Sequence, residues 1–111
     1  MAKDYNFKIH TNIMRALKRS NEVIPDSKFT TLDGIILCMV KSFADANIPC
    51  FISINEISNI TLSSKSSVQR SIKRLCSANL LQRKTELQDD GSTKYYLVYN
   101  EKEVNLLLYL A

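Results

Sequence analysis

Glycine and proline are scarce in this chain, and their scarcity constrains the fold more than any other feature. The 111 residues contain only two glycines and two prolines. A β-sandwich turns about every ten residues, and its turns draw heavily on these two residue types. Hydrophobic residues make up 45% of the chain and charged residues 23%, which is typical of a globular domain and not of a disordered one. We therefore expect a single, mostly helical domain over residues 1–111.

Hydrophobic spacing predicts a core-facing helix over residues 32–45. Apolar side chains recur there at intervals of three and four residues, and they are Leu32, Ile35, Ile36, Met39, Val40 and Phe43. Thr30 or Thr31 would cap this helix. Asn47 and Pro49 would end it.

Shorter elements flank this helix. A preceding helix would begin at Thr11 or Asn12, either of which offers a capping side chain. Its apolar side would consist of Ile13, Met14 and Leu17. The apolar residues 50–52, on the other flank, favour one short strand.

Two helix starts then follow one another closely. Ser53, with Glu56 three residues later, forms a capping box and predicts a short helix through Ile60. A second helix is predicted from Lys65 to about Asn79. The hydroxyls available to cap it are those of Thr61, Ser63 and Ser64.

Two extended segments, residues 81–87 and 94–100, come next. Asp90-Gly91 lies between them and is typical of a β-hairpin turn. Residues 101–111 favour a last helix, because acidic side chains at its start suit the helix dipole. Two short helices joined by a tight turn and followed by a hairpin predict a mainly helical α+β fold of the winged helix-turn-helix type.

The predicted helix over residues 65–79 has two chemically different sides. With about 100° of rotation per residue, the apolar side carries Val68, Ile72, Leu75 and Asn79. The other side carries hydroxyl, amide and cationic groups, supplied by Ser66, Ser67, Gln69, Arg70, Lys73, Arg74 and Ser77. Such groups contact phosphates and read base edges, with arginine suited to guanine and glutamine to adenine. The alternative is a solvated surface helix without a partner.

Positive charge is concentrated in and after this helix. No acidic residue occurs between residues 57 and 85, where six basic ones do, whereas the whole chain has a net charge of only +4. We therefore predict a double-stranded DNA partner with this helix in the major groove. The predicted contacts are Ser64, Lys65, Ser66, Ser67, Gln69, Arg70, Lys73 and Arg74 on the helix, and Arg83, Lys84 and Lys94 on the hairpin.

The hairpin tip carries the opposite charge. Asp89 and Asp90 would be repelled by phosphates. Either the hairpin contacts DNA through the basic residues nearer its base, or its tip faces a protein.

The stretch CFISINEISNITLSSKSSVQRSIKRLCSANLLQRK, followed by GSTKYYLVYN, resembles the helix-turn-helix domains at the N-termini of phage and plasmid replication initiators and related mobile-element proteins. The matching positions are Phe51, Ser53, Ser64, Ser67, Val68, Arg70, Ile72, Leu75, Leu80, Leu81, Tyr95 and Tyr96. The likeness covers roughly residues 7–99. Leu62 and Ser63 depart from it, because the family has glycine and then leucine there.

The resemblance implies a sequence-specific DNA-binding accessory factor of a mobile genetic element. Such a factor would mark an origin of replication or of conjugative transfer for larger machinery. A small transcriptional regulator is one alternative, and a winged-helix protein-interaction module is another.

The predicted last helix is apolar nearly all round. We expect it to pair two copies of the chain into a homodimer, although docking on the N-terminal helix is the alternative. The predicted dimerisation residues are Val104, Leu107, Leu108 and Leu110. A two-fold dimer would match DNA half-sites about 34 Å apart.

Several classes of function are disfavoured. One histidine, and three cysteines without a CxxC pair, predict no metal site. The sequence lacks a glycine-rich phosphate loop and a Ser-His pair with an acid. A strand-nicking tyrosine would also need a metal-holding cluster. We therefore expect neither an enzyme nor a cofactor. Apolar runs are too short to span a membrane and no signal pattern opens the chain, which favours a cytoplasmic protein.

Overall fold

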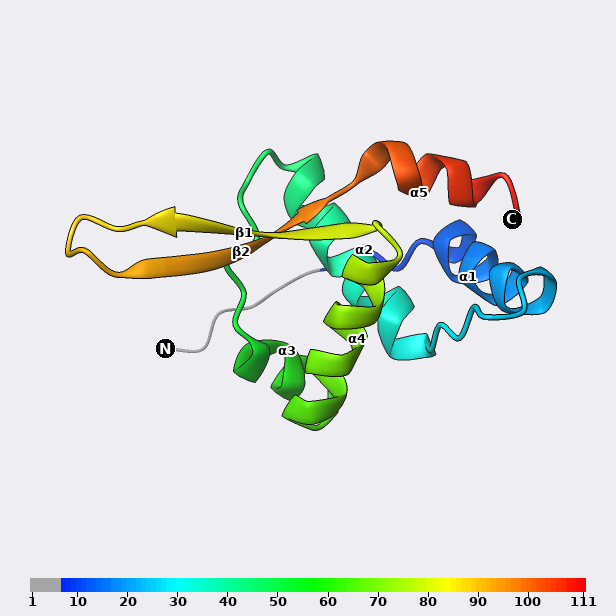
Figure 1. Cartoon of the computed structure of the whole chain (residues 1–111), viewed down its shortest axis with the longest axis horizontal. Helices are drawn as coiled ribbons and strands as arrows, with labels where there is room; N and C mark the ends of the chain where they lie inside the picture. The colour runs from blue at the N-terminus through cyan, green and yellow to red at the C-terminus, as the bar shows by residue number, and fades with distance from the viewer. Residues whose placement is uncertain (1–6) are drawn as a thin grey trace.

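A computed structural model describes residues 7–111, so the first six residues of the predicted domain lie outside it (Figure 1). Its elements are α1 (Thr11–Val23), α2 (Thr31–Asp45), α3 (Ile54–Thr61), α4 (Lys65–Ser77), β1 (Leu81–Leu87), β2 (Thr93–Tyr99) and α5 (Glu101–Leu108). Figure 1 shows the helices gathered together and the β1–β2 hairpin projecting beyond them. This α+β winged helix-turn-helix fold confirms the prediction.

The core surrounds α2, which packs against α1, α3, α4 and β2. Because neighbours cover this helix on several sides, Leu37 and Cys38 are fully buried although the predicted apolar stripe left them out. The two ends of the predicted stripe, Leu32 and Phe43, are only partly buried. A Cβ on Gly34 would collide with the end of the flexible Met14 side chain, which packs into the space beside this glycine between α1 and α2.

Capping side chains fix where α2 and α3 begin. The Thr30 hydroxyl accepts from the Asp33 backbone N–H at 3.2 Å, and the Asp33 carboxylate accepts from the Thr30 N–H at 2.9 Å. Ser53 and Glu56 form the same reciprocal pair at 3.0 and 3.2 Å. The predicted capping box of α3 is therefore confirmed, and Thr30 rather than Thr31 caps α2.

The predicted cap of α1 and the predicted strand over residues 50–52 are wrong. The N-cap of α1 is His10, whose side chain makes no capping bond. Cys50 forms only an isolated bridge with Leu97, whose N–H donates to the Cys50 carbonyl at 3.0 Å. Ser53 is already the N-cap of α3, so too few residues remain after Cys50 to form a strand.

Helix α4 ends two residues earlier than predicted, and the reason is Asn79. Its backbone is left-handed, with φ of 61°, and its side chain is exposed instead of lying on the apolar side. The Leu80 N–H donates to the Leu75 carbonyl, which closes a Schellman motif. The Asn100 side chain, which caps α5, also donates to the Asn79 carbonyl at 2.8 Å.

The hairpin is a regular antiparallel ladder from Leu81↔Tyr99 to Leu87↔Thr93. Gly91 closes its turn with φ of 86°, a conformation that favours glycine. Leu81 and Leu97 are buried at the base, whereas the outer half of the hairpin is exposed. The confirmed hairpin is therefore a wing anchored at one end.

Candidate nucleic-acid interface

The turn between α3 and α4 places a leucine where glycine is favoured. Leu62 has φ of 54° and ψ of 36°, and 93% of it is exposed. A left-handed backbone costs a non-glycine residue roughly 1–2 kcal/mol. The turn is held by Ser58, whose carbonyl accepts from the Ser63 N–H at 3.1 Å and whose hydroxyl donates to the Ser63 carbonyl. The departure from the family pattern thus keeps the tight turn at a cost in strain.

Ser64 is the residue that caps α4. Its hydroxyl oxygen accepts from the Ser67 N–H at 3.1 Å and lies 2.9 Å from the Ser67 hydroxyl. Arg70 donates to that same Ser67 hydroxyl at 3.3 Å. These contacts order the first turn of α4 and occupy the hydroxyls of both serines.

The predicted contact residues of α4 mostly lie on its exposed side. The exposed ones are Ser64, Lys65, Ser66, Gln69, Arg70 and Lys73, whereas Ser67 and Arg74 are half-buried. Val68, Ser71, Ile72 and Leu75 face the core. Helix α4 therefore presents amide, hydroxyl and cationic groups outward from a rigid, buried base.

Arg74 is the exception, because its guanidinium is engaged by a buried carboxylate. Its Nε and Nη2 atoms donate to Asp33 at 2.8 and 2.9 Å, and the Ser71 hydroxyl donates to the same carboxylate. Asp33 is 0% exposed, whereas the Arg74 side chain is 35% exposed. The geometry therefore assigns Arg74 to the joint between α4 and α2 and not to the outward face.

The Asp33 carboxylate remains ionised in this joint. Burial alone would raise its pKa, but the hydrogen bonds from Arg74, Ser71 and the Thr30 backbone lower the pKa of Asp33 below its usual value. The same contact raises the pKa of Arg74. No local motif marks this network, because its acid and its base are 41 residues apart.

One basic residue of the hairpin, Arg83, lies beside α4. Arg83, together with Gln69 and Lys73 of α4, lines a hollow of about 390 Å³ between helix and hairpin. Lys84 and Lys94 are exposed on the two strands, and the Lys94 Nζ lies 4.6 Å from the centre of the Phe51 ring. Arg83 therefore joins the cations of α4, whereas Lys84 and Lys94 lie on the other face of the hairpin, because side chains alternate between faces along each strand.

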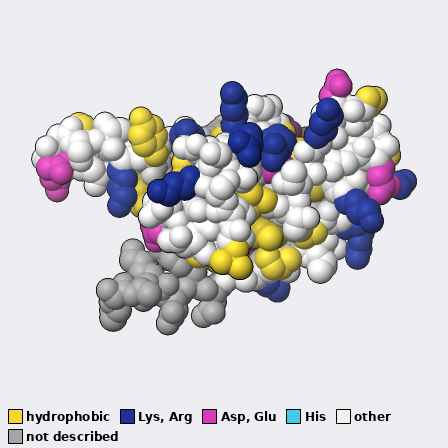
Figure 2. Space-filling model, turned by 90° about the horizontal axis from the view of Figure 1, so that it is seen from below, with side chains coloured by type: hydrophobic (Ala, Val, Ile, Leu, Met, Phe, Trp, Pro, Cys, Tyr) yellow, Lys and Arg dark blue, Asp and Glu magenta, His cyan; other side chains and the backbone are white. Residues whose placement is uncertain are grey.

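Few carboxylates accompany these cations. Figure 2 shows Lys and Arg side chains gathered on the face seen from below, where α3 and α4 lie in Figure 1. Three ion pairs occur within residues 7–111, and only that of Arg74 involves a predicted contact residue. The basic residues left without a carboxylate partner in that range are Lys65, Arg70, Lys73, Arg83, Lys84 and Lys94.

At the hairpin tip, one acid has a structural role. Asp90 accepts hydrogen bonds from the hydroxyl and the N–H of Ser92, at 2.5 and 2.9 Å, and these bonds lower its pKa. The role of Asp90 is therefore to stabilise the hairpin turn. Asp89 is exposed beside it.

In α5, one predicted dimerisation residue belongs to the core instead. Val104 is 0% exposed and part of the main hydrophobic cluster, so it is not available to a second chain. Leu107 and Leu108 pack partly against the same cluster, because α5 docks on α1. The most exposed apolar residues here are Leu106, at 55%, and Tyr109, at 87%.

Comparisons with known proteins agree with this architecture. Residues 30–81 match the family model of a helix-turn-helix domain. This range contains α2, α3 and α4, the helices whose geometry is described above. The chain has the winged helix-turn-helix fold.

Solved structures with the same fold include regulators. A possible transcriptional regulator from Methanosarcina mazei is 24% identical, with a TM-score of 0.54 over 96% of this chain and 81% of that one. BldR from Sulfolobus solfataricus is 16% identical, with a TM-score of 0.53 over 90% of this chain. S. aureus MepR bound to ethidium bromide is 14% identical, with a TM-score of 0.54 over 91% of this chain.

The chain spans 63% of BldR and 65% of MepR, slightly less than two thirds of each. The sequence matches none of the curated proteins with which it was compared. Within residues 7–111, no helix is long and apolar enough to cross a membrane. The same residues contain no group of three or more His, Cys, Asp or Glu side chains that could hold a metal ion.

Proposed function

We propose that this protein is a transcriptional regulator that binds double-stranded DNA without catalysing a reaction. The observation that carries the proposal is the set of basic side chains without carboxylate partners on α4 and the hairpin. Helix α4 would enter the major groove, where Arg70 and Gln69 project from a rigid base and can read base edges. Arg83, Lys84 and Lys94 would contact the backbone or the adjacent minor groove.

The first experiment is selection of bound sequences from random duplexes of about 30 base pairs. An enriched motif would support sequence-specific recognition. Its affinity should fall by roughly 10²–10³-fold between 50 and 200 mM salt if four or five phosphates are contacted. Absence of enrichment, together with weak retention of all duplexes, would contradict the proposal and favour a protein-interaction module.

Two variants separate base reading from general attraction. Arg70→Ala should weaken binding by about 1–3 kcal/mol and relax specificity at one position of the motif. Arg15→Ala is the matched control, because Arg15 is also an exposed helical arginine but lies on α1. Equal losses in the two variants would contradict the placement of α4 in the groove.

An origin-binding accessory factor of a mobile element is the second candidate, and the resemblance to replication initiators favours it. Both functions use the same interface, so they differ only in where the selected motif occurs. Motifs at promoters would support the regulator. Motifs clustered at an origin of replication or transfer would support the accessory factor and a connection to larger machinery.

We further propose that the protein acts as a homodimer through exposed Leu106 of α5 and exposed Tyr109 just after it, together with the half-buried Leu110, instead of the buried Val104. Leu106→Lys with Tyr109→Lys should give monomers in sedimentation without unfolding the chain, because both side chains are exposed. Asn105→Lys, on an exposed position of the same helix, is the control. A wild-type chain that sediments as a monomer at all concentrations would contradict the dimer.

A further inference from the structure

The Arg70 guanidinium is held against the outer surface of α4 by a short chain of hydrogen bonds. Its Nη2 donates to the Ser67 hydroxyl at 3.3 Å. The hydroxyl of Ser64, the N-cap of α4, donates to the same Ser67 oxygen at 2.9 Å and accepts from the Ser67 N–H at 3.1 Å. The cap of the helix and its exposed arginine are therefore linked through Ser67.

This chain of bonds points the Arg70 side chain toward the start of α4. Residues three apart lie one above the other on a helix, and long side chains lean toward its N-terminus. Ser67 belongs to the first turn of α4, which begins at Lys65, so the guanidinium lies beside that turn. In helix-turn-helix proteins the N-terminal residues of the recognition helix contact base edges. Arg70 is therefore held near the end of α4 that would reach the bases under the proposed function.

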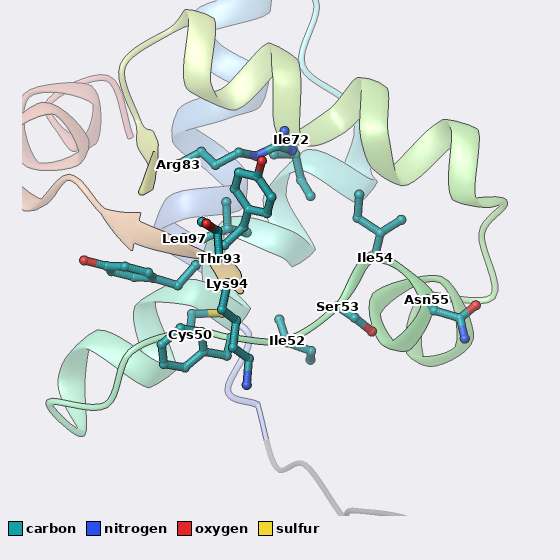
Figure 3. Close-up of a pocket in the computed structure, with 13 residues that line it drawn as sticks. Cys50, Ile52, Ser53, Ile54, Asn55, Ile72, Arg83, Thr93, Lys94 and Leu97 are labelled. Carbon is teal, nitrogen blue, oxygen red and sulfur yellow. The ribbon is translucent and has the colours of Figure 1, made fainter. Parts of the chain in front are cut away.

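No other neighbour fixes Arg70 in the described part of the chain. Within residues 7–111 it makes no ion pair, and its hydrogen bond to Ser67 is the only one of its side chain. The hairpin approaches another edge of α4, where Arg83 extends toward Ile72 (Figure 3). A cavity of about 750 Å³ opens there beside Phe51, and Arg70 does not line it. The orientation of Arg70 thus depends on Ser67.

The bond to Ser67 leaves Arg70 able to bind a base. A guanidinium has five N–H donors, and Ser67 takes one of them. Two further donors are enough for the O6 and N7 atoms of guanine. A long side chain loses rotamer freedom when it binds, and one that is already held loses less.

We propose that Ser67 is a positioning residue, which orients Arg70 for base reading and does not contact DNA itself. Ser67 is half-buried, and its oxygen already accepts two hydrogen bonds. This assignment replaces the direct DNA contact that the sequence predicts for Ser67. The reading of a base by Arg70 rests on the proposed function, whereas the order of Arg70 in the free chain does not.

The first test therefore uses the free chain and measures the NMR order parameter of the Arg70 Nε–H. Arg15 is the internal reference, because it is an exposed helical arginine without a hydrogen bond or ion pair among the described residues. We expect Arg70 to be more ordered than Arg15 in the wild type and to fall to the level of Arg15 in Ser67→Ala. Ser67→Thr keeps the hydroxyl and should keep the order. Ser77→Ala, at an exposed serine near the other end of α4, is the control and should leave Arg70 unchanged.

The second test measures base discrimination at the motif position that Arg70→Ala relaxes, as the ratio of affinities for the preferred and a substituted base pair. Ser67→Ala should lower this ratio by about threefold to tenfold, whereas Ser67→Thr should restore most of it. In the Arg70→Ala background, Ser67→Ala should have no further effect, because Ser67 acts only through Arg70. Losses of equal size in both backgrounds would mean that Ser67 contacts DNA directly and would overturn the proposal.

Both Ser67 variants should fold, because the Ser64 hydroxyl caps the backbone N–H of residue 67 and not its side chain, and circular dichroism checks this. Equal order of Arg70 in the wild type and in Ser67→Ala would overturn the positioning role, whatever the DNA result. If no duplex motif is enriched, the proposed function fails, and the order of Arg70 still decides whether Ser67 holds it. If a motif is bound but its discrimination does not depend on Ser67, only this inference fails.

Discussion

Replacing Asp33 with asparagine should destabilise the fold much more than removing a surface carboxylate. The Asp33 carboxylate is fully buried and accepts from Arg74 at 2.8 and 2.9 Å, from Ser71, and from the Thr30 backbone at 2.9 Å. Asparagine has one acceptor oxygen instead of two, and its amide N–H groups would face groups that are themselves donors. Asp33→Asn therefore removes the charge and leaves buried donors unpaired.

The magnitude follows from the burial of the two partners. Breaking a fully buried ion pair costs about 3–5 kcal/mol, but Arg74 is 35% exposed and keeps part of its hydration. We therefore expect Asp33→Asn to lower the free energy of unfolding by about 2–3 kcal/mol at pH 7. With a urea dependence of about 1–3 kcal/mol/M, the unfolding midpoint should fall by about 0.7–3 M.

Asp45→Asn is the matched control for this measurement. Asp45 pairs with Lys41 at 3.0 Å, but its side chain is 58% exposed. Removing such a surface pair should cost less than about 1 kcal/mol. Equal losses of stability in the two variants would refute the reasoning.

The pH dependence gives the same prediction a second check. The pKa of Asp33 lies below its usual value of 3.8, so ionised Asp33 stabilises the fold at and above that pH. This contribution is lost as the pH falls through the lowered pKa of the folded state. The difference between the wild-type chain and Asp33→Asn should therefore begin to shrink below about pH 4 and should vanish only below the lowered pKa of folded Asp33. A difference that stays constant into acid would contradict the role of the charge.

Three further predictions concern strain, packing and thiol reactivity. Leu62→Gly should be more stable to urea than Leu62→Ala by about 0.5–1 kcal/mol, because only glycine relieves the left-handed strain. Val104→Ala should lower the free energy of unfolding by about 2 kcal/mol or more, whereas Leu106→Ala should change it by less than about 0.5 kcal/mol, since only Val104 is buried. Burial raises the pKa of the Cys50 thiol to about 11, so at pH 8 a disulfide reagent should modify Cys50 far more slowly in native than in urea-unfolded chain. In the native chain Cys76 is only half-buried and should be modified first. Modification of native Cys50 as fast as that of Cys76 would contradict this order.

The sequence determined those parts of the protein that depend on neighbours along the chain. The capping box at Ser53, the turn at Gly91 and the polar side of α4 each follow from local spacing, because caps, turns and helix faces are set by residues within a few positions of one another. Their order was enough to predict a winged helix-turn-helix fold with its basic residues on one helix and the hairpin.

Only the tertiary structure decided what happens where distant segments meet. The sequence pattern places Arg70 and Arg74 together on the cationic side of α4. In the structure Arg70 is exposed but Arg74 binds Asp33, because α2 lies against one edge of α4. The apolar pattern of α5 does not reveal that Val104 enters the core, and no motif marks the cavity beside Phe51. The physical reason is that burial and pairing depend on which surfaces come together in three dimensions, whereas a local pattern specifies only which faces are available to pack.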